Sequence, residues 1–96
     1  MSLFQPNDYG KLMSVELSEI FQKFVKAKDI SDVSEKQNVP IGTINAVIYR
    51  NRKINEQNAP ALIELMKIVN RKALEMKSFA DLAVEKTKIS LTTKIK

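Results

Sequence analysis

The hydrophobic residues in the first third of the chain recur at every third or fourth position. That spacing places them on one face of an α-helix, so the pattern predicts a first helix over residues 13–28 that packs into a core. The segment before it is rich in turn-forming residues and predicts an irregular arm. The inward-facing residues of the helix are Met13, Leu17, Ile20, Phe21, Phe24 and Val25.

The chain between Asp29 and Lys53 contains two short apolar sets that are separated by a polar turn. The first set predicts a short helix that ends near Gln37. The turn is predicted at Asn38, since asparagine adopts the left-handed conformation more readily than any residue except glycine. Pro40 suits the first turn of a new helix, because its missing N–H would be unpaired there anyway. The inward-facing residues of the two helices are Ile30, Val33 and Ser34, and then Ile44, Val47 and Ile48.

The longest helical pattern begins at Ala59 and contains no glycine. Its apolar residues keep to one stripe, which predicts one helix over residues 59–86, or two helices with a bend near residues 71–78. The tail, residues 87–96, has a different pattern, in which apolar and polar residues alternate. Alternation is typical of a strand or an extended arm, and a frayed basic end is the other interpretation.

Together these patterns predict an all-α fold in a single domain, residues 1–96. Residues 13–58 would form a small helical bundle around a central helix-turn-helix, followed by the long helix and the basic tail with its short strand or arm. A bundle of three short helices covers only the first half of the long helix, so the second half requires another surface. We therefore expect a homo-oligomer, with a dimer favoured, formed through Leu62, Val69, Met76, Phe79 and Ala83.

Composition limits the chemistry that this chain can perform. It has no cysteine and no histidine, which excludes disulfides, thiolate chemistry, the commonest metal ligands and the usual general base. There is no glycine-rich phosphate-binding loop. We expect neither enzymatic activity nor a bound cofactor or metal. No apolar run approaches the ~18 residues of a membrane span, so we expect no contact with a membrane and a cytoplasmic location, in a bacterium or an infected host cell.

The charge of the chain suits a polyanionic partner, but its distribution matters more. The net charge is +5, and most of the excess lies in the C-terminal third. Residues 29–58 are neutral, with four basic and four acidic side chains. Within them the acids Asp29, Asp32 and Glu35 precede the turn, whereas a basic cluster follows the second helix. This separation allows a locally positive edge.

The spacing of the turn and the buried positions resembles that of the helix-turn-helix in the phage-repressor and Cro-like family, also called the XRE type. Four positions separate Ser34 from Asn38, six separate Asn38 from Ile44, and three separate Ile44 from Val47. The resemblance covers about 25 residues, or about 60 with the flanking helices. The chain departs from the family pattern at Gln37, where a hydrophobic residue is usual, and Ser34 and Asn38 are the less common residues at their positions.

The resemblance implies that the second helix of the motif, residues 41–50, enters the major groove of double-stranded DNA. Asn45 is the best candidate for a base contact, since its amide can pair with adenine, which is worth about 1–3 kcal/mol of discrimination. The implied base contacts are Thr43, Asn45, Ala46 and Tyr49, and the implied phosphate contacts are Gly42, Arg50, Asn51, Arg52 and Lys53.

Three functions are compatible with these expectations. The first is a small dimeric transcriptional regulator that reads two half-sites about one helical turn apart. The second is a DNA-recognition and assembly protein, such as the small subunit of a phage terminase, which would form a larger ring. The third is a structural protein that uses the helix-turn-helix only as a scaffold, because fold alone does not decide function.

Overall fold

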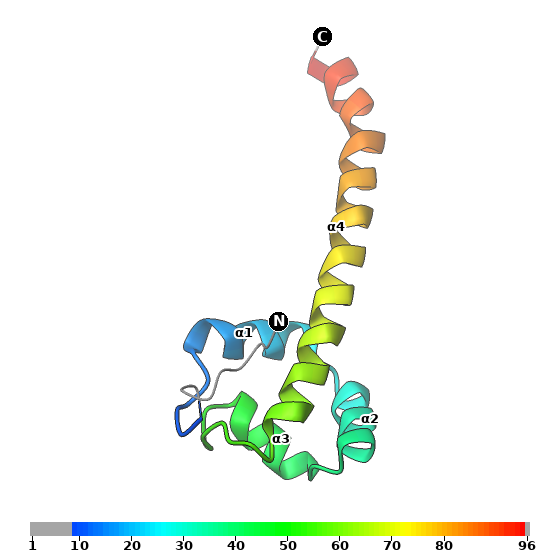
Figure 1. Ribbon diagram of the computed structural model, residues 1–96. Helices are drawn as coiled ribbons and strands as arrows, with labels where there is room; N and C mark the ends of the chain where they lie inside the picture. Colours follow the sequence, from blue (N-terminus) through cyan, green and yellow to red (C-terminus); the bar gives the residue numbers. More distant parts are fainter. Residues whose placement is uncertain (1–8, 96) are drawn as a thin grey trace.

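The computed structural model describes residues 9–95 of the chain, with side chains through residue 87. This part of the chain is all-α, as predicted, and contains no strand. Three short helices pack around the first half of a long fourth helix, which then projects away from them (Figure 1). The helices are α1 (Val15–Phe24), α2 (Ala27–Gln37), α3 (Ile41–Ile48) and α4 (Ala59–Ile95).

The first predicted helix is wrong in its length, because the chain breaks it before Lys26. The Ser14 hydroxyl oxygen accepts a hydrogen bond from the Leu17 N–H at 3.1 Å and starts α1. At Val25 the backbone is extended, and α2 begins two residues later. The Asp29 carboxylate accepts a hydrogen bond from the Lys26 N–H at 2.8 Å, which caps the new helix. No glycine or proline marks this break in the sequence.

The predicted turn between α2 and α3 is confirmed. Asn38 has a left-handed backbone, with φ of 57°. The N–H of the following residue, Val39, donates to the Ser34 carbonyl at 3.2 Å, the bond that closes a helix C-terminus of this kind. Val39 is itself buried, and Pro40 stands immediately before α3. The turn therefore fixes the angle at which α3 leaves α2.

The core lies between the three short helices and the first three turns of α4. The three apolar residues predicted to face inward from α3 are all buried. Of the residues expected to face inward earlier in the chain, Met13, Phe21 and Val33 are buried, whereas Ile20 is 38% exposed. The largest fully enclosed apolar side chains are those of Phe21, Met13, Ile44, Leu62, Leu65, Val33 and Val47.

Two asparagines start α4 by binding each other. The Asn55 Oδ1 accepts from the Asn58 N–H at 2.8 Å, and the Asn58 Oδ1 accepts from the Asn55 N–H at 2.9 Å. This reciprocal pair is equivalent to a capping box. Asn58 is only 1% exposed, and its Nδ2 also donates to the Lys53 carbonyl at 3.1 Å. The loop after α3 is thereby fastened to the start of α4.

The strand or arm predicted for the tail is wrong, since α4 continues as one helix to Ile95. Adding residues to an existing helix costs little, whereas an isolated strand needs a partner strand. The oligomer residues also need correction. Leu62 and Val69 are buried in the chain's own core, while Met76, Phe79 and Ala83 lie on the exposed part of α4. Over residues 9–95, no helix combines the length and the apolar character that a membrane crossing requires.

Candidate nucleic-acid interface

Helix α3 lies at the end of the molecule opposite to the free end of α4 (Figure 1). Its buried side holds it against the core, and the tight turn holds it against α2. Helix α2 is fastened to α4 by two ion pairs, Lys36 with Glu64 at 3.2 Å and Asp29 with Lys72. The orientation of α3 is therefore set by the whole bundle.

The outward face of α3 is built mainly from small residues. At 3.6 residues per turn, Gly42, Ala46 and Tyr49 lie opposite the buried side of the helix. Tyr49 is 56% exposed, and a Cβ added to Gly42 would meet nothing within 4 Å. Thr43 and Asn45 flank this strip on either side and are half-buried. The structure thus places the predicted base contacts on one face, with the polar ones at its edges.

The chain after α3 is a defined turn and not a loose loop. Arg50 has a left-handed backbone with φ of 63°, and its N–H donates to the Val47 carbonyl at 3.1 Å. The N–H groups of Asn51 and Arg52 both donate to the Ala46 carbonyl, at 2.7 and 3.1 Å. This pattern closes the C-terminus of the helix. The backbone that carries the basic cluster is consequently held at a fixed position next to α3.

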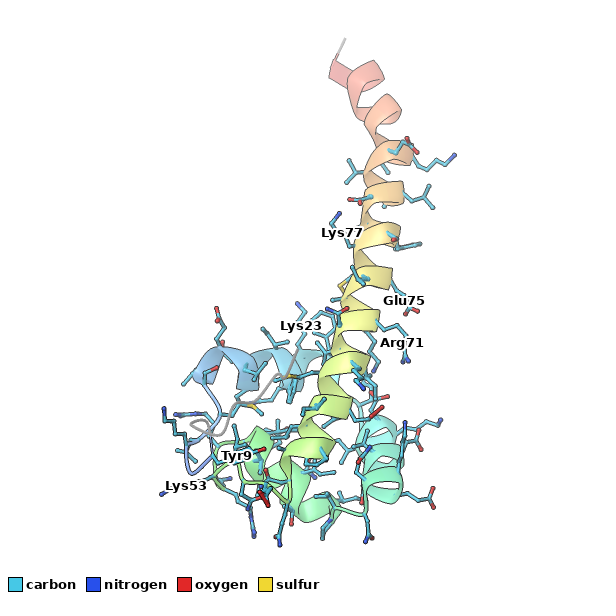
Figure 2. The ribbon with its side chains drawn as sticks, viewed as in Figure 1. Tyr9, Lys23, Lys53, Arg71, Glu75 and Lys77 are labelled. Atoms are coloured by element: carbon cyan, nitrogen blue, oxygen red, sulfur yellow. The ribbon has the colours of Figure 1, made fainter. Side chains whose placement is uncertain are left out.

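Arg50 has a structural role that the sequence did not reveal. Its Nε donates a hydrogen bond to the Met13 carbonyl at 2.7 Å, across 37 positions of sequence. The bond ties the segment before α1 to the end of α3. Arg52 and Lys53 are exposed and form no ion pair with the side chains of residues 9–87. Lys53 projects outward at the same end of the molecule as α3 (Figure 2).

An open hollow of about 480 Å³ lies beside the start of α3. It brings Thr43 of α3 together with Arg52 of the basic cluster. Val39, Pro40 and polar side chains of the α2–α3 turn and of the loop before α4 complete its wall. Sequence reasoning did not assign these polar residues to the site. Only the polar composition of the loop hinted at them. These further residues are Asn38, Asn55, Gln57 and Asn58.

Two of the four acids of the neutral central segment form ion pairs away from α3. Asp32 pairs with Lys28 at 3.6 Å, and Asp29 pairs with Lys72 of α4. Burial raises the pKa of the Asp29 carboxyl, but hydrogen bonds from Lys72 and the Lys26 N–H, with the charges of Lys72 and Arg71, outweigh it and lower the pKa below its ordinary value of 3.8. The carboxylate is therefore ionised at neutral pH, and the positive charge beside α3 is not paired with it.

We compared the chain with protein-family models, with curated proteins and with solved structures. None of the three comparisons finds a match.

Proposed function

We propose that this protein binds double-stranded DNA with sequence preference, with α3 in the major groove, and acts as a small transcriptional regulator. The observation that carries the proposal is the uncovered outward face of α3, on a helix that the turn at Asn38 and the core hold rigidly. An α-helix fits the width of the major groove. Within the described residues no other segment covers this face, and a contact with DNA requires such an open face.

The side chains on this face have complementary tasks. Gly42 and Ala46 are small, so the axis of α3 can approach the base pairs closely. Asn45 and Thr43 at the edges supply donors and acceptors for base edges, and Tyr49 supplies both a hydroxyl and an apolar ring. The predicted order of importance for sequence preference places Asn45 first.

Phosphate contacts are assigned to the basic turn after α3. Arg52 and Lys53 are exposed on a backbone that is fixed by hydrogen bonds, and Arg52 shares the hollow with Thr43. Contacts with phosphates position a protein on the duplex without reading its sequence, and they make affinity fall as salt rises. Arg50 contributes less, because its Nε is already bonded to the Met13 carbonyl.

A gel-shift titration on DNA selected from a random pool tests the proposal. We expect Asn45→Ala to bind selected and scrambled DNA with similar affinity, because the base contact is lost. We expect Arg52→Ala to weaken binding to both and to lower the slope of log affinity against log salt by about one. The charge control is Lys23→Ala, which removes an exposed positive side chain from α1 (Figure 2).

Two outcomes would contradict the proposal. The first is the absence of any shift by the wild-type chain at ~50 mM salt, where phosphate contacts are strong. The second is an equal loss of affinity in Lys23→Ala and Arg52→Ala, since binding would then follow net charge and not the α3 surface. Circular dichroism of each variant checks that the helices are intact.

A further inference from the structure

The C-terminal half of α4 carries an apolar stripe that the described part of the chain leaves uncovered. From Leu74 through Thr87 every side chain is exposed. Phe79 is the extreme case, with 72% of its surface exposed. Contiguous apolar surface of this kind marks an interaction site in soluble proteins. The stripe consists of Met76, Phe79, Ala80 and Ala83, with Leu82 and Val84 along its edges.

This stripe is the direct continuation of the face that α4 buries in its own bundle. At 3.6 residues per turn, Met76, Ala80 and Ala83 fall in line with Leu65 and Val69. The first group is exposed and the second is buried. From Leu62 to Ala83, helix α4 thus presents one apolar face, and the bundle covers only the first part of it.

We propose that the partner of the exposed stripe is the same stripe on a second copy of this chain, and that the two α4 helices run antiparallel. The bundle itself determines the direction. A parallel partner would have to continue beside Leu65 and Val69, where α1 and α2 already pack against α4. In an antiparallel pair, residues 74–87 of the two copies meet outside the bundle, and only residues 88–95 of the partner reach the bundle, beside the groove that α1 and Ala73 line.

A groove between α1 and α4 provides the additional surface that a stable dimer needs. An aromatic side chain has a surface of ~200 Å², so the exposed part of Phe79 amounts to roughly 150 Å². The whole stripe exposes on the order of 500 Å² per chain. Stable interfaces bury about 600 Å² or more per partner. Leu17, Phe21 and Ala73 line an apolar groove of about 520 Å³ between α1 and α4, at the point where the stripe leaves the bundle. The antiparallel arrangement brings the distal part of each α4 to the groove of the other copy.

Charges on the edges of the stripe agree with this arrangement. If residues 74–87 pair along their whole length, the two-fold axis passes between Ala80 and Asp81. Glu75 and Lys86 lie on the same edge at equal distances from that axis, so Glu75 of each copy faces Lys86 of the other. Lys77 projects from the opposite side of α4 to Glu75 (Figure 2) and would face an apolar residue, Val84. Among residues 74–87, this pairing brings no like charges together.

Light scattering on the full chain without DNA tests the pairing. We expect a dimer at micromolar concentration, and at least a tenfold weaker association for Phe79→Gln. The matched control is Leu74→Gln, because Leu74 is 58% exposed but lies on the opposite side of α4; it should remain a dimer. Neither residue is in the bundle core, so folding is unaffected. A monomeric wild type, a mass well above that of a dimer, or equal effects of the two variants would overturn the proposal.

Disulfide trapping tests the direction, and the absence of native cysteines makes single-cysteine variants unambiguous. In the antiparallel pair the two copies of residue 76 are about 14 Å apart along the helix axis, which is too far for a disulfide. Residue 76 of one copy and residue 83 of the other are only about 3 Å apart along the axis. We expect Met76→Cys to form no disulfide with itself but to form one with Ala83→Cys in a mixture. A disulfide within Met76→Cys alone would establish a parallel pair and overturn the direction. Both readouts are independent of DNA binding.

Discussion

Asp29 connects three segments of the protein through one carboxylate. It accepts the Lys26 N–H that starts α2, and it pairs with Lys72 of α4 across 43 positions of sequence. The Lys72 Nζ also donates to the Phe24 carbonyl, the last residue of α1, at 2.9 Å. The side chain of Asp29 is 17% exposed, so solvent screens these bonds only in part. The break between α1 and α2 therefore depends on a residue of α4.

The lowered pKa of Asp29 predicts a dependence of stability on pH. Because the unfolded chain takes up the proton first, the stabilisation is complete above the unfolded pKa of about 4 and is lost as the pH falls through the folded pKa. We expect Asp29→Asn to lower the free energy of unfolding by about 1–3 kcal/mol at pH 7. The free energies of unfolding of the variant and the wild type should converge in urea titrations once the pH falls below the folded pKa of Asp29.

A neighbouring acid provides the control for this prediction. Asp32 is 63% exposed and pairs with Lys28, which is 88% exposed. Such surface pairs contribute little, so Asp32→Asn should change the free energy of unfolding far less than Asp29→Asn. A similar loss of stability in both variants would contradict the prediction that the Asp29 hydrogen bonds stabilise the fold more than a surface ion pair does.

For individual helices, the sequence predicted the features that depend on residues close together in the chain. The turn at Asn38 and the buried side of α3 follow from residues within ten positions of one another. The break before Lys26 was not predictable in this way, because Asp29, which caps α2, binds Lys72, 43 positions away. The role of Arg50 was not predictable either, because its partner Met13 is 37 positions away. On the candidate site, periodicity identified the exposed face of α3. It could not show that Thr43 and Arg52 share a hollow.

Gly42 gives a prediction for α3. The position has a helical backbone and open space around it, so Gly42→Ala should raise the free energy of unfolding by about 0.5–1 kcal/mol. If α3 approaches DNA closely, the same change should weaken DNA binding. Gly10→Ala is the contrasting variant, because Gly10 has φ of 85° and alanine is strained there. Thermal melts and gel shifts on both variants measure these effects. A loss of stability in Gly42→Ala would contradict the assignment.

At the scale of the whole molecule, the protein is an elongated body of 58 × 26 × 25 Å, and the free part of α4 accounts for its length (Figure 1). Every residue of the buried core lies between Met13 and Val69. The bundle should therefore not depend on residues 74–96 for its own packing. Residues 74–87 add the exposed apolar stripe, which we propose pairs with a second copy.

Truncation after Ala73 separates the two contributions. We expect the shortened chain to fold and to unfold at the same urea concentration whatever the protein concentration. The full chain should become more resistant to urea as its concentration rises, because association stabilises only the folded state. Urea titrations followed by circular dichroism, over a hundredfold range of protein concentration, distinguish the truncated chain from the full chain. A full chain with a fixed midpoint would be evidence against self-association through α4.

The length of α4 also determines which DNA sites a dimer could bind at the same time. In an antiparallel pair the two bundles lie at opposite ends, with the starts of their α4 helices roughly 60 Å apart. Adjacent half-sites on a straight duplex are about 34–36 Å apart, so the two α3 helices could not both read them. A DNA-binding dimer of this shape would instead need half-sites about two helical turns apart on one duplex, or two separate stretches of DNA that it would hold together as a rigid tether. In the second case, occupying one site would raise the effective concentration at a second only where the DNA path returns to the far end.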